Sequence, residues 1–217
     1  MGRRSLRRID PSLDLSRHLL SLDALTPPVT GEAVFGRVAP LEIEVGSGKG
    51  LFLTSAAANH PANHYLGIEI AGKYARFAAA RLKKRELTNA KMIHGNAERL
   101  FDEFISDSSL AAVHVYFPDP WWKKRHKKRR IMNPTFVRHI ERALEPGGRL
   151  HFWSDVEEYF QVSLDLLARE TGLVGPQPVA PRAAEHDLDY RTHFERRMRL
   201  HGAKVFRSQF AKPSWVA

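Results

Sequence analysis

The sequence predicts an α/β fold with a doubly wound, mostly parallel sheet over residues 41–217, preceded by an extended, partly disordered basic arm over residues 1–40. Two observations support this prediction. Short apolar segments alternate with longer segments of helical periodicity, an order typical of a parallel sheet with helices on both faces. The first apolar segment also runs directly into a glycine-rich turn, as a strand does where such a sheet opens onto a ligand site.

The predicted elements follow one another in a regular order. The expected strands are residues 41–45, 65–70, 91–94, 111–117 and 149–153. The expected helices are residues 51–59, 72–87, 97–105, 134–144 and 156–171. A loop rich in proline and glycine is expected over 175–190, and one or two closing strands are expected over 194–210.

Positive charge is concentrated in two short segments. The formal net charge is +10, and four arginines (Arg3, Arg4, Arg7 and Arg8) lie near the start of the chain. A second segment, residues 121–130, contains seven Lys and Arg residues and no acid, so the rest of the chain is nearly neutral. Such clustering indicates a polyanionic partner. A solvated charged face is the alternative for the second segment, and a solubilising tail for the first.

Several classes of site and compartment are disfavoured by composition. The chain has no cysteine, which excludes disulfides, cysteine zinc sites and thiol catalysis, and no metal site is expected. Ile9-Asp10-Pro11 stands where a signal peptide would be apolar, and no apolar run is long enough to cross a bilayer. We therefore expect a cytoplasmic protein with no membrane partner.

The glycine turn predicts a cofactor site. Its pattern, G-x-G-x-G from Gly46 to Gly50, lacks the third glycine spacing of a dinucleotide fingerprint and the Lys-Ser/Thr pair of a P-loop. Acids precede it at Glu42 and Glu44. This combination fits S-adenosylmethionine, which carries a sulfonium and an ammonium but no phosphate. A glycine turn in some other α/β protein is the alternative.

Polar residues at the ends of the next two strands fit the same cofactor. Glu69 ends the second strand, where an acid typically accepts hydrogen bonds from a ribose diol. Asn96 follows the third strand, where its amide is placed to read an adenine edge. Either residue alone is equally compatible with a helix cap.

A rigid carboxylate follows the fourth strand. Asp119 lies between Pro118 and Pro120, which restrict the backbone on both sides of it. Trp121 and Trp122 come next, followed by the basic segment. Aromatic rings beside cations are the combination expected for RNA, since rings stack on bases and cations contact phosphates.

The sequence resembles bacterial tRNA (guanine-N7-)-methyltransferases over about residues 40–210. The resemblance rests on LEIEVGSGKG, YLGIEI, VYFPDPWWKKRHKKRRI, HFWSD and THFE. It implies a Rossmann-like class I methyltransferase fold and transfer of a methyl group from S-adenosylmethionine to a guanosine in the tRNA variable loop, at tRNA position 46. Monomer and homodimer both remain compatible with the sequence.

The resemblance also implies roles for individual residues. Asp119 is the expected catalytic residue, and the expected cofactor contacts are Glu42, Gly46, Gly48, Glu69, Asn96 and Asp119. The expected substrate contacts are Lys123, Asp155, Thr192, His193, Phe194 and Glu195. The expected RNA contacts are Arg125, His126, Lys127, Lys128, Arg129 and Arg130.

Two residues depart from the family pattern, and two alternative functions remain. Glu44 occupies a position where the family usually has glycine, and it either adds a second carboxylate near the cofactor cation or faces a neighbouring helix. Asn96 occupies a position where Asp is common. The alternative functions are methylation of another target, such as ribosomal RNA or a protein, and RNA binding with a vestigial cofactor pocket.

Overall fold

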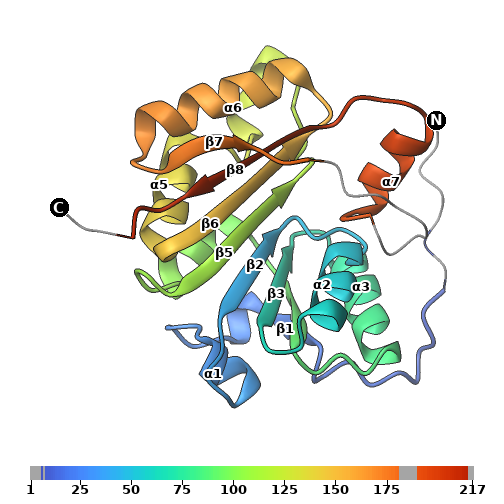
Figure 1. The fold of residues 1–217 in the computed structure, drawn as a ribbon. Helices are drawn as coiled ribbons and strands as arrows, with labels where there is room; N and C mark the ends of the chain where they lie inside the picture. The colour runs from blue at the N-terminus through green and yellow to red at the C-terminus, as the bar shows by residue number, and fades with distance from the viewer. Residues whose placement is uncertain (1–5, 7, 181–189, 215–217) are drawn as a thin grey trace.

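The computed structural model describes residues 6, 8–180 and 190–214 of the 217-residue chain. Its eight-stranded sheet has the order β1-β4-β3-β2-β5-β6-β8-β7 (Figure 1). The strand order reverses at β2 (Leu41–Val45), which lies between β3 (His64–Glu69) and β5 (Leu110–Tyr116). Ligands bind at such a switch point, outside the carboxyl ends of the parallel strands.

The parallel part of the sheet confirms the predicted α/β fold. β4 (Ala90–His94) and β6 (Leu144–Ser154) flank the three central strands, and all five run parallel. The observed strands match the predicted ones closely, except that β6 begins earlier. It continues through Gly147, whose φ of 81° accompanies a register shift between β5 and β6.

Helices cover both faces of the sheet. α2 (Leu51–Asn59) and α3 (Gly72–Lys84) pack on one face, and α5 (Pro134–Ala143) and α6 (Glu157–Glu170) pack on the other (Figure 1). A short α4 (Ala97–Arg99) continues into a π-helical turn, Leu100–Phe104, on the α5 side.

The hydrophobic core is correspondingly divided in two. Alternate strand residues point to opposite faces, so Leu66 and Ile68 contribute to the cluster under α5 and α6, whereas Tyr65 contributes to the cluster under α2 and α3. The acids and polar residues that follow the strands lie at the carboxyl ends of the parallel strands, where a ligand can reach them.

The segment before residue 41 belongs partly to the sheet. β1 (Leu19–Ser21) pairs in parallel with β4, and α1 (Gly31–Phe35) follows, with the Thr30 side chain accepting a hydrogen bond from Ala33 N. Leu22 is only 2% exposed in the core. The sheet therefore starts earlier than the predicted boundary at 41. The few apolar side chains of this polar segment pack into the core once β1 pairs with β4 as an edge strand. Residues 1–5 and 7 of the predicted arm lie outside the described residues.

The end of the chain also differs from the prediction. β8 (Phe206–Ala211) is the expected closing strand, but residues 193–200 form helix α7 (His193–Leu200) rather than a strand. Thr192 and Glu195 explain the helix start, since the Thr192 side chain caps Glu195 N and the Glu195 carboxylate accepts from the backbone N–H of Arg191, just before the cap. β7 (Val174–Pro178) lies within the predicted loop and pairs antiparallel with β8 at the sheet edge, where prolines are tolerated. Residues 181–189 of that loop lie outside the described residues.

Candidate active site and nucleic-acid interface

The glycine turn after β2 has a backbone conformation that favours glycine. Gly46, Gly48 and Gly50 have φ values of 75°, 51° and 67°. A Cβ atom at Gly50 would come within 2.6 Å of the Cβ of Ala78, so this residue also allows α2 to approach α3. The turn therefore leaves the backbone between β2 and α2 open to a ligand at Gly46 and Gly48.

Glu69 lies beside this turn at the end of β3. One carboxylate oxygen accepts a hydrogen bond from Gly48 N at 2.9 Å, and the other accepts one from Ala71 N at 2.9 Å. Because each carboxylate oxygen has two lone pairs, both oxygens retain the capacity to accept from a diol. Glu69 thus positions the glycine turn while still facing the site that it borders.

Glu44, two residues before the first glycine of the turn, is the second acid at this point. It is 3% exposed, and its Oε2 atom has no hydrogen-bond partner. Burial raises the pKa of its carboxyl group to about 8, and the nearby Glu69 carboxylate contributes to the increase. A buried acid with an unused oxygen fits a cationic ligand, since a cation would stabilise its charged form.

Glu42 lies elsewhere, which differs from the expectation. It is three residues before the end of β2, roughly 10 Å from the strand end. Its carboxylate accepts hydrogen bonds from Asn63 Nδ2 at 2.8 Å and Tyr65 OH at 3.3 Å, and it pairs with His114 Nε2 at 2.7 Å. These three partners account for Glu42 as a half-buried structural acid. Of the two acids of β2, Glu44 is the one that lies next to the glycine turn.

Asn96 caps a helix, which was the alternative to an adenine contact for this residue. Its Oδ1 accepts from Glu98 N at 2.8 Å and Arg99 N at 3.3 Å at the start of α4. The side-chain NH₂ group therefore remains as the group of Asn96 that could donate to an adenine ring. Asn96 is exposed at the end of β4, on the same side of the sheet as Glu69.

The loop that carries Asp119 follows β5 and is strained at both ends. Phe117 and Trp121 have φ values of 51° and 44°, which bulky residues rarely adopt. Arg130 Nε donates to the carbonyl oxygen of Pro120 at 2.7 Å, and its guanidinium lies 4.7 Å from the ring centroid of Tyr159. Asp119 itself is exposed. The loop backbone on both sides of Asp119 is therefore restrained, and Arg130 contributes to that restraint.

Asp155 follows β6 directly and is half-buried. β5 and β6 are parallel neighbours, with Tyr116 opposite Trp153, so Asp119 and Asp155 follow adjacent strand ends. Among the described residues, neither carboxylate has a hydrogen-bonding or ion-pair partner. These two carboxylates thus lie at the carboxyl ends of adjacent parallel strands, on the β5 and β6 side of the sheet.

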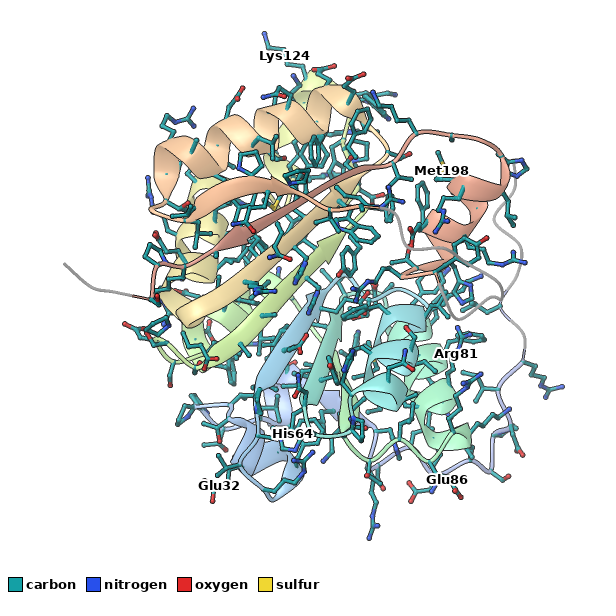
Figure 2. All side chains as sticks on the ribbon, viewed as in Figure 1. Glu32, His64, Arg81, Glu86, Lys124 and Met198 are labelled. Atoms are coloured by element: carbon teal, nitrogen blue, oxygen red, sulfur yellow. The ribbon has the colours of Figure 1, made fainter. Side chains whose placement is uncertain are left out.

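The basic segment forms a short 3₁₀ helix, Lys124–Arg129. Lys123, Lys124, Arg125, Lys127, Lys128 and Arg129 are exposed, and Figure 2 shows Lys124 projecting away from the body of the molecule. Within the described part of the chain, none of these six cations has a carboxylate within salt-bridge distance. His126 and Arg130 are half-buried, so their contacts are partly within the protein. The exposed cations form a surface suited to phosphates.

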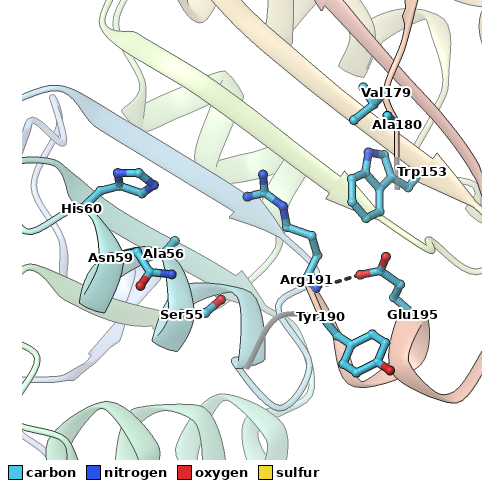
Figure 3. Close-up of a pocket in the computed structure, with 10 residues that line it drawn as sticks. All are labelled: Ser55, Ala56, Asn59, His60, Trp153, Val179, Ala180, Tyr190, Arg191 and Glu195. Atoms are coloured by element: carbon cyan, nitrogen blue, oxygen red, sulfur yellow. Dashed lines mark hydrogen bonds between the residues drawn. The ribbon is translucent and has the colours of Figure 1, made fainter. Parts of the chain in front are cut away.

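The four residues Thr192 to Glu195 start α7 and connect it to two other parts of the protein. Thr192 Oγ1 accepts from Glu195 N, and Glu195 Oε2 accepts from Arg191 N (Figure 3). His193 Nε2 lies 2.5 Å from an Arg81 nitrogen of α3, and Phe194 packs at 4.9 Å from Phe117. These contacts place α7 against both α3 and the Asp119 loop.

Glu195 is buried as an ion pair. It is 2% exposed, and its Oε1 lies 2.9 Å from Arg207 of β8. A neighbouring pocket is lined by residues of α2, the end of β6 and the start of α7, including Ser55, Asn59 and Arg191 (Figure 3). Glu44, Glu69 and Asp119 are not among the residues that line this pocket.

A doubly wound sheet with a glycine turn after its central strand, two acids at that turn and a rigid carboxylate on the adjacent strand defines an S-adenosylmethionine-dependent methyltransferase of the Rossmann-like class. The family described as "Putative methyltransferase" matches residues 38–208. The 16S rRNA methyltransferase KamB has a similar structure, with a TM-score of 0.62 and 17% identity over 84% of this chain and 92% of that one. An S-adenosylmethionine-dependent O-methyltransferase from Thermotoga maritima has a TM-score of 0.55 and 16% identity, over 86% of this chain and 64% of that one.

Sequence relatives identify the family to which the chain belongs within this class of methyltransferases. The tRNA (guanine-N(7)-)-methyltransferase of Rhodopirellula baltica is 50% identical over 99% of this chain and 81% of its own length. That of Alkalilimnicola ehrlichii is 38% identical over 85% of this chain and 78% of its own length. The chain belongs to the tRNA (guanine-N7-)-methyltransferase family, and its methyl donor is S-adenosylmethionine.

Proposed function

We propose that this chain transfers the methyl group of S-adenosylmethionine to N7 of a guanosine in the variable loop of tRNA, at tRNA position 46. The observation that carries the proposal is the continuity of one loop. It passes from the end of β5, through Asp119, into the exposed cations of the 3₁₀ helix. A nucleic acid held by those cations lies beside the carboxylate and the cofactor site.

The residues present fit a cationic methyl donor. Glu44 has an unused buried oxygen, Glu69 has spare acceptor capacity for a ribose, and the Asn96 amide is open to an adenine. When bound, S-adenosylmethionine supplies an electrophilic methyl group on a positively charged sulfur. Glu44 and Glu69 would hold this group, in place of the Glu42 and Glu69 pair that the sequence predicted.

The chemistry of N7 explains why a fixed carboxylate is enough. N7 of guanosine has a free lone pair and no proton, so its attack requires no general base. The reaction needs N7 aligned with the methyl group, which is a proximity effect worth several kcal/mol. Asp119, with Asp155 beside it, accepts hydrogen bonds from guanine N1–H and the exocyclic amine. These carboxylates also stabilise the positive charge that methylation places on the purine.

The remaining predicted residues bind and position the substrate. Lys123, Arg125, Lys127, Lys128 and Arg129 contact the RNA backbone, and His126 and Arg130 hold the loop from within. Thr192 and Glu195 fix the start of α7, and His193 and Phe194 join it to α3 and to the Asp119 loop. The substrate thus lies between the 3₁₀ helix and α7.

The decisive experiment measures methyl transfer to unmodified tRNA. Purified protein, labelled S-adenosylmethionine and an unmodified tRNA transcript should yield 7-methylguanosine, and a transcript with adenosine at position 46 should yield none. Label on another nucleotide, or on ribosomal RNA or protein instead, would establish a different target. RNA binding without transfer would establish the vestigial-pocket alternative.

The place of action follows from the substrate. We propose that the chain acts in the cytoplasm, as a monomer or a homodimer, where newly made tRNA is modified. Among the described residues, the helices are all too short or too polar to pass through a membrane.

A further inference from the structure

The two consecutive tryptophans after the Asp119 loop lie in different surroundings. Trp121 is half-buried, with the Arg129 guanidinium 5.1 Å from its ring centroid and the His126 ring edge-on at 5.7 Å. Trp122 is 63% exposed, and within the described part of the chain its ring contacts neither a cation nor another ring. Trp121 therefore has a structural explanation, and the described residues offer none for Trp122.

The backbone presents Trp122 in a defined position. The φ of 44° at Trp121 turns the chain sharply just before it, and Pro120 restricts the residue before that turn. The Arg130 hydrogen bond to the Pro120 carbonyl holds the loop from the other side. An exposed side chain on a restrained loop loses less conformational entropy on binding than one on a flexible loop.

The surroundings of Trp122 fit a nucleic acid better than a protein. The residues that follow it, Lys123, Lys124 and Arg125, are exposed cations. The other large exposed apolar side chains belong to other segments: Val38, Ile70, Val162, Val174 and Leu200. A protein-binding patch would gather several apolar side chains, whereas a single aromatic ring among cations matches a stacked base with its phosphates.

We propose that Trp122 stacks on a nucleotide base next to the target guanosine and holds the RNA strand while that guanosine enters the site. This inference rests on the proposed function. Asp119, which faces the target guanine, precedes Trp122 by three residues, and the phosphate-binding cations follow it directly. The indole thus stands between the reacting base and the backbone contacts, where a flanking nucleotide lies.

A double-mutant cycle tests the stacking. The full-length protein and its Trp122→Ala and Trp122→Phe variants are assayed on three tRNA transcripts: intact, abasic on the 5′ side of the target and abasic on the 3′ side. Loss of one stacked base corresponds to about five- to 150-fold. We expect Trp122→Ala to raise KM for intact tRNA by that factor with a smaller change in kcat, and Trp122→Phe to retain most of the affinity.

The coupling between residue and base decides the outcome. One abasic transcript should weaken the wild-type protein as much as Trp122→Ala does, and should weaken Trp122→Ala little further. Additive losses at both abasic positions, or a Trp122→Phe variant as defective as Trp122→Ala, would overturn the proposal.

Two controls separate this proposal from other causes of failure. Val174→Ala truncates an equally exposed apolar side chain at the far edge of the sheet and should leave KM unchanged. Unchanged S-adenosylmethionine affinity in Trp122→Ala shows that the variant is folded. If the wild-type protein binds the transcript without methylating it, the proposed function fails, and the same cycle measured on Kd still tests the stacking.

Discussion

Replacement of Glu44 by glutamine tests the cofactor site through a property of the protein alone. The Glu44 carboxyl is buried beside Glu69, and burial raises its pKa from 4.5 to about 8. A group whose pKa is higher in the folded state than in the unfolded state contributes stability that is fully present below the unfolded value. That contribution is lost as the pH rises through the folded value.

The size of this loss follows from the pKa of Glu44. Each pH unit between 4.5 and 8 removes about 1.4 kcal/mol, so the folded state loses at most about 5 kcal/mol between acid and alkaline pH. A glutamine side chain has the same shape as a glutamate side chain and does not ionise. We therefore expect Glu44→Gln to match the wild type near pH 4.5 and to be several kcal/mol more stable at pH 9.

Urea unfolding at pH 5, 7 and 9 measures this difference, and Glu32→Gln, an exposed acid of α1, is the matched control. Other titrating groups cancel because they are common to both proteins. Calorimetric titration with S-adenosylmethionine gives the second readout. The wild-type affinity should rise toward pH 8, by at most tenfold per pH unit, because the ligand cation selects the ionised carboxylate.

The Glu44→Gln variant should bind the cofactor more weakly, and with little pH dependence. Stability curves that remain parallel for wild type and variant from pH 5 to 9 would refute the buried, raised-pKa carboxyl. Normal pH-dependent binding by Glu44→Gln would refute its contact with the cofactor cation.

Three further predictions concern the substrate side. Asp119→Ala should abolish methyl transfer while tRNA affinity, measured by filter binding, stays nearly unchanged; retained activity would mean that another carboxylate orients the guanine. Replacing both Lys127 and Lys128 with glutamine should make the negative slope of log K against log salt shallower, by about 0.7 to 0.9 for each lost phosphate contact. An unchanged slope would exclude both residues as RNA contacts. Glu195→Gln should cost about 3 kcal/mol in chemical denaturation, because it leaves the Arg207 guanidinium, itself 8% exposed on its side chain, without its carboxylate; wild-type stability would show that this pair is dispensable.

Much of the site was predictable because its residues are adjacent in sequence. Gly46 and Gly48 are close to the end of β2, and Asp119 lies between its prolines, so local chemistry indicated their positions without a structure. Asn96 was ambiguous for a physical reason: an amide that follows a strand can cap the next helix or contact a ligand, and the sequence pattern is the same for both. The cap is what the structure contains.

Other assignments required long-range contacts. Glu42 and Glu44 are equivalent in sequence, both acids on one face of β2. Only the packing shows that Asn63, Tyr65 and His114 engage the first and leave an oxygen of the second free. Helix α7 was read as a strand, although the Thr192 and Glu195 spacing was a signal for a helix start.

The sequence by itself determined the alternating fold, the glycine turn, the fixed carboxylate and the basic segment, because each depends on residues close together along the chain. The tertiary structure decided which acid keeps an oxygen without a partner, that Arg130 restrains the Asp119 loop, and that Trp121 is half-buried while Trp122 is exposed. These distinctions depend on burial and on partners distant in sequence, and two neighbouring residues of the same type differ in them only after the chain has folded.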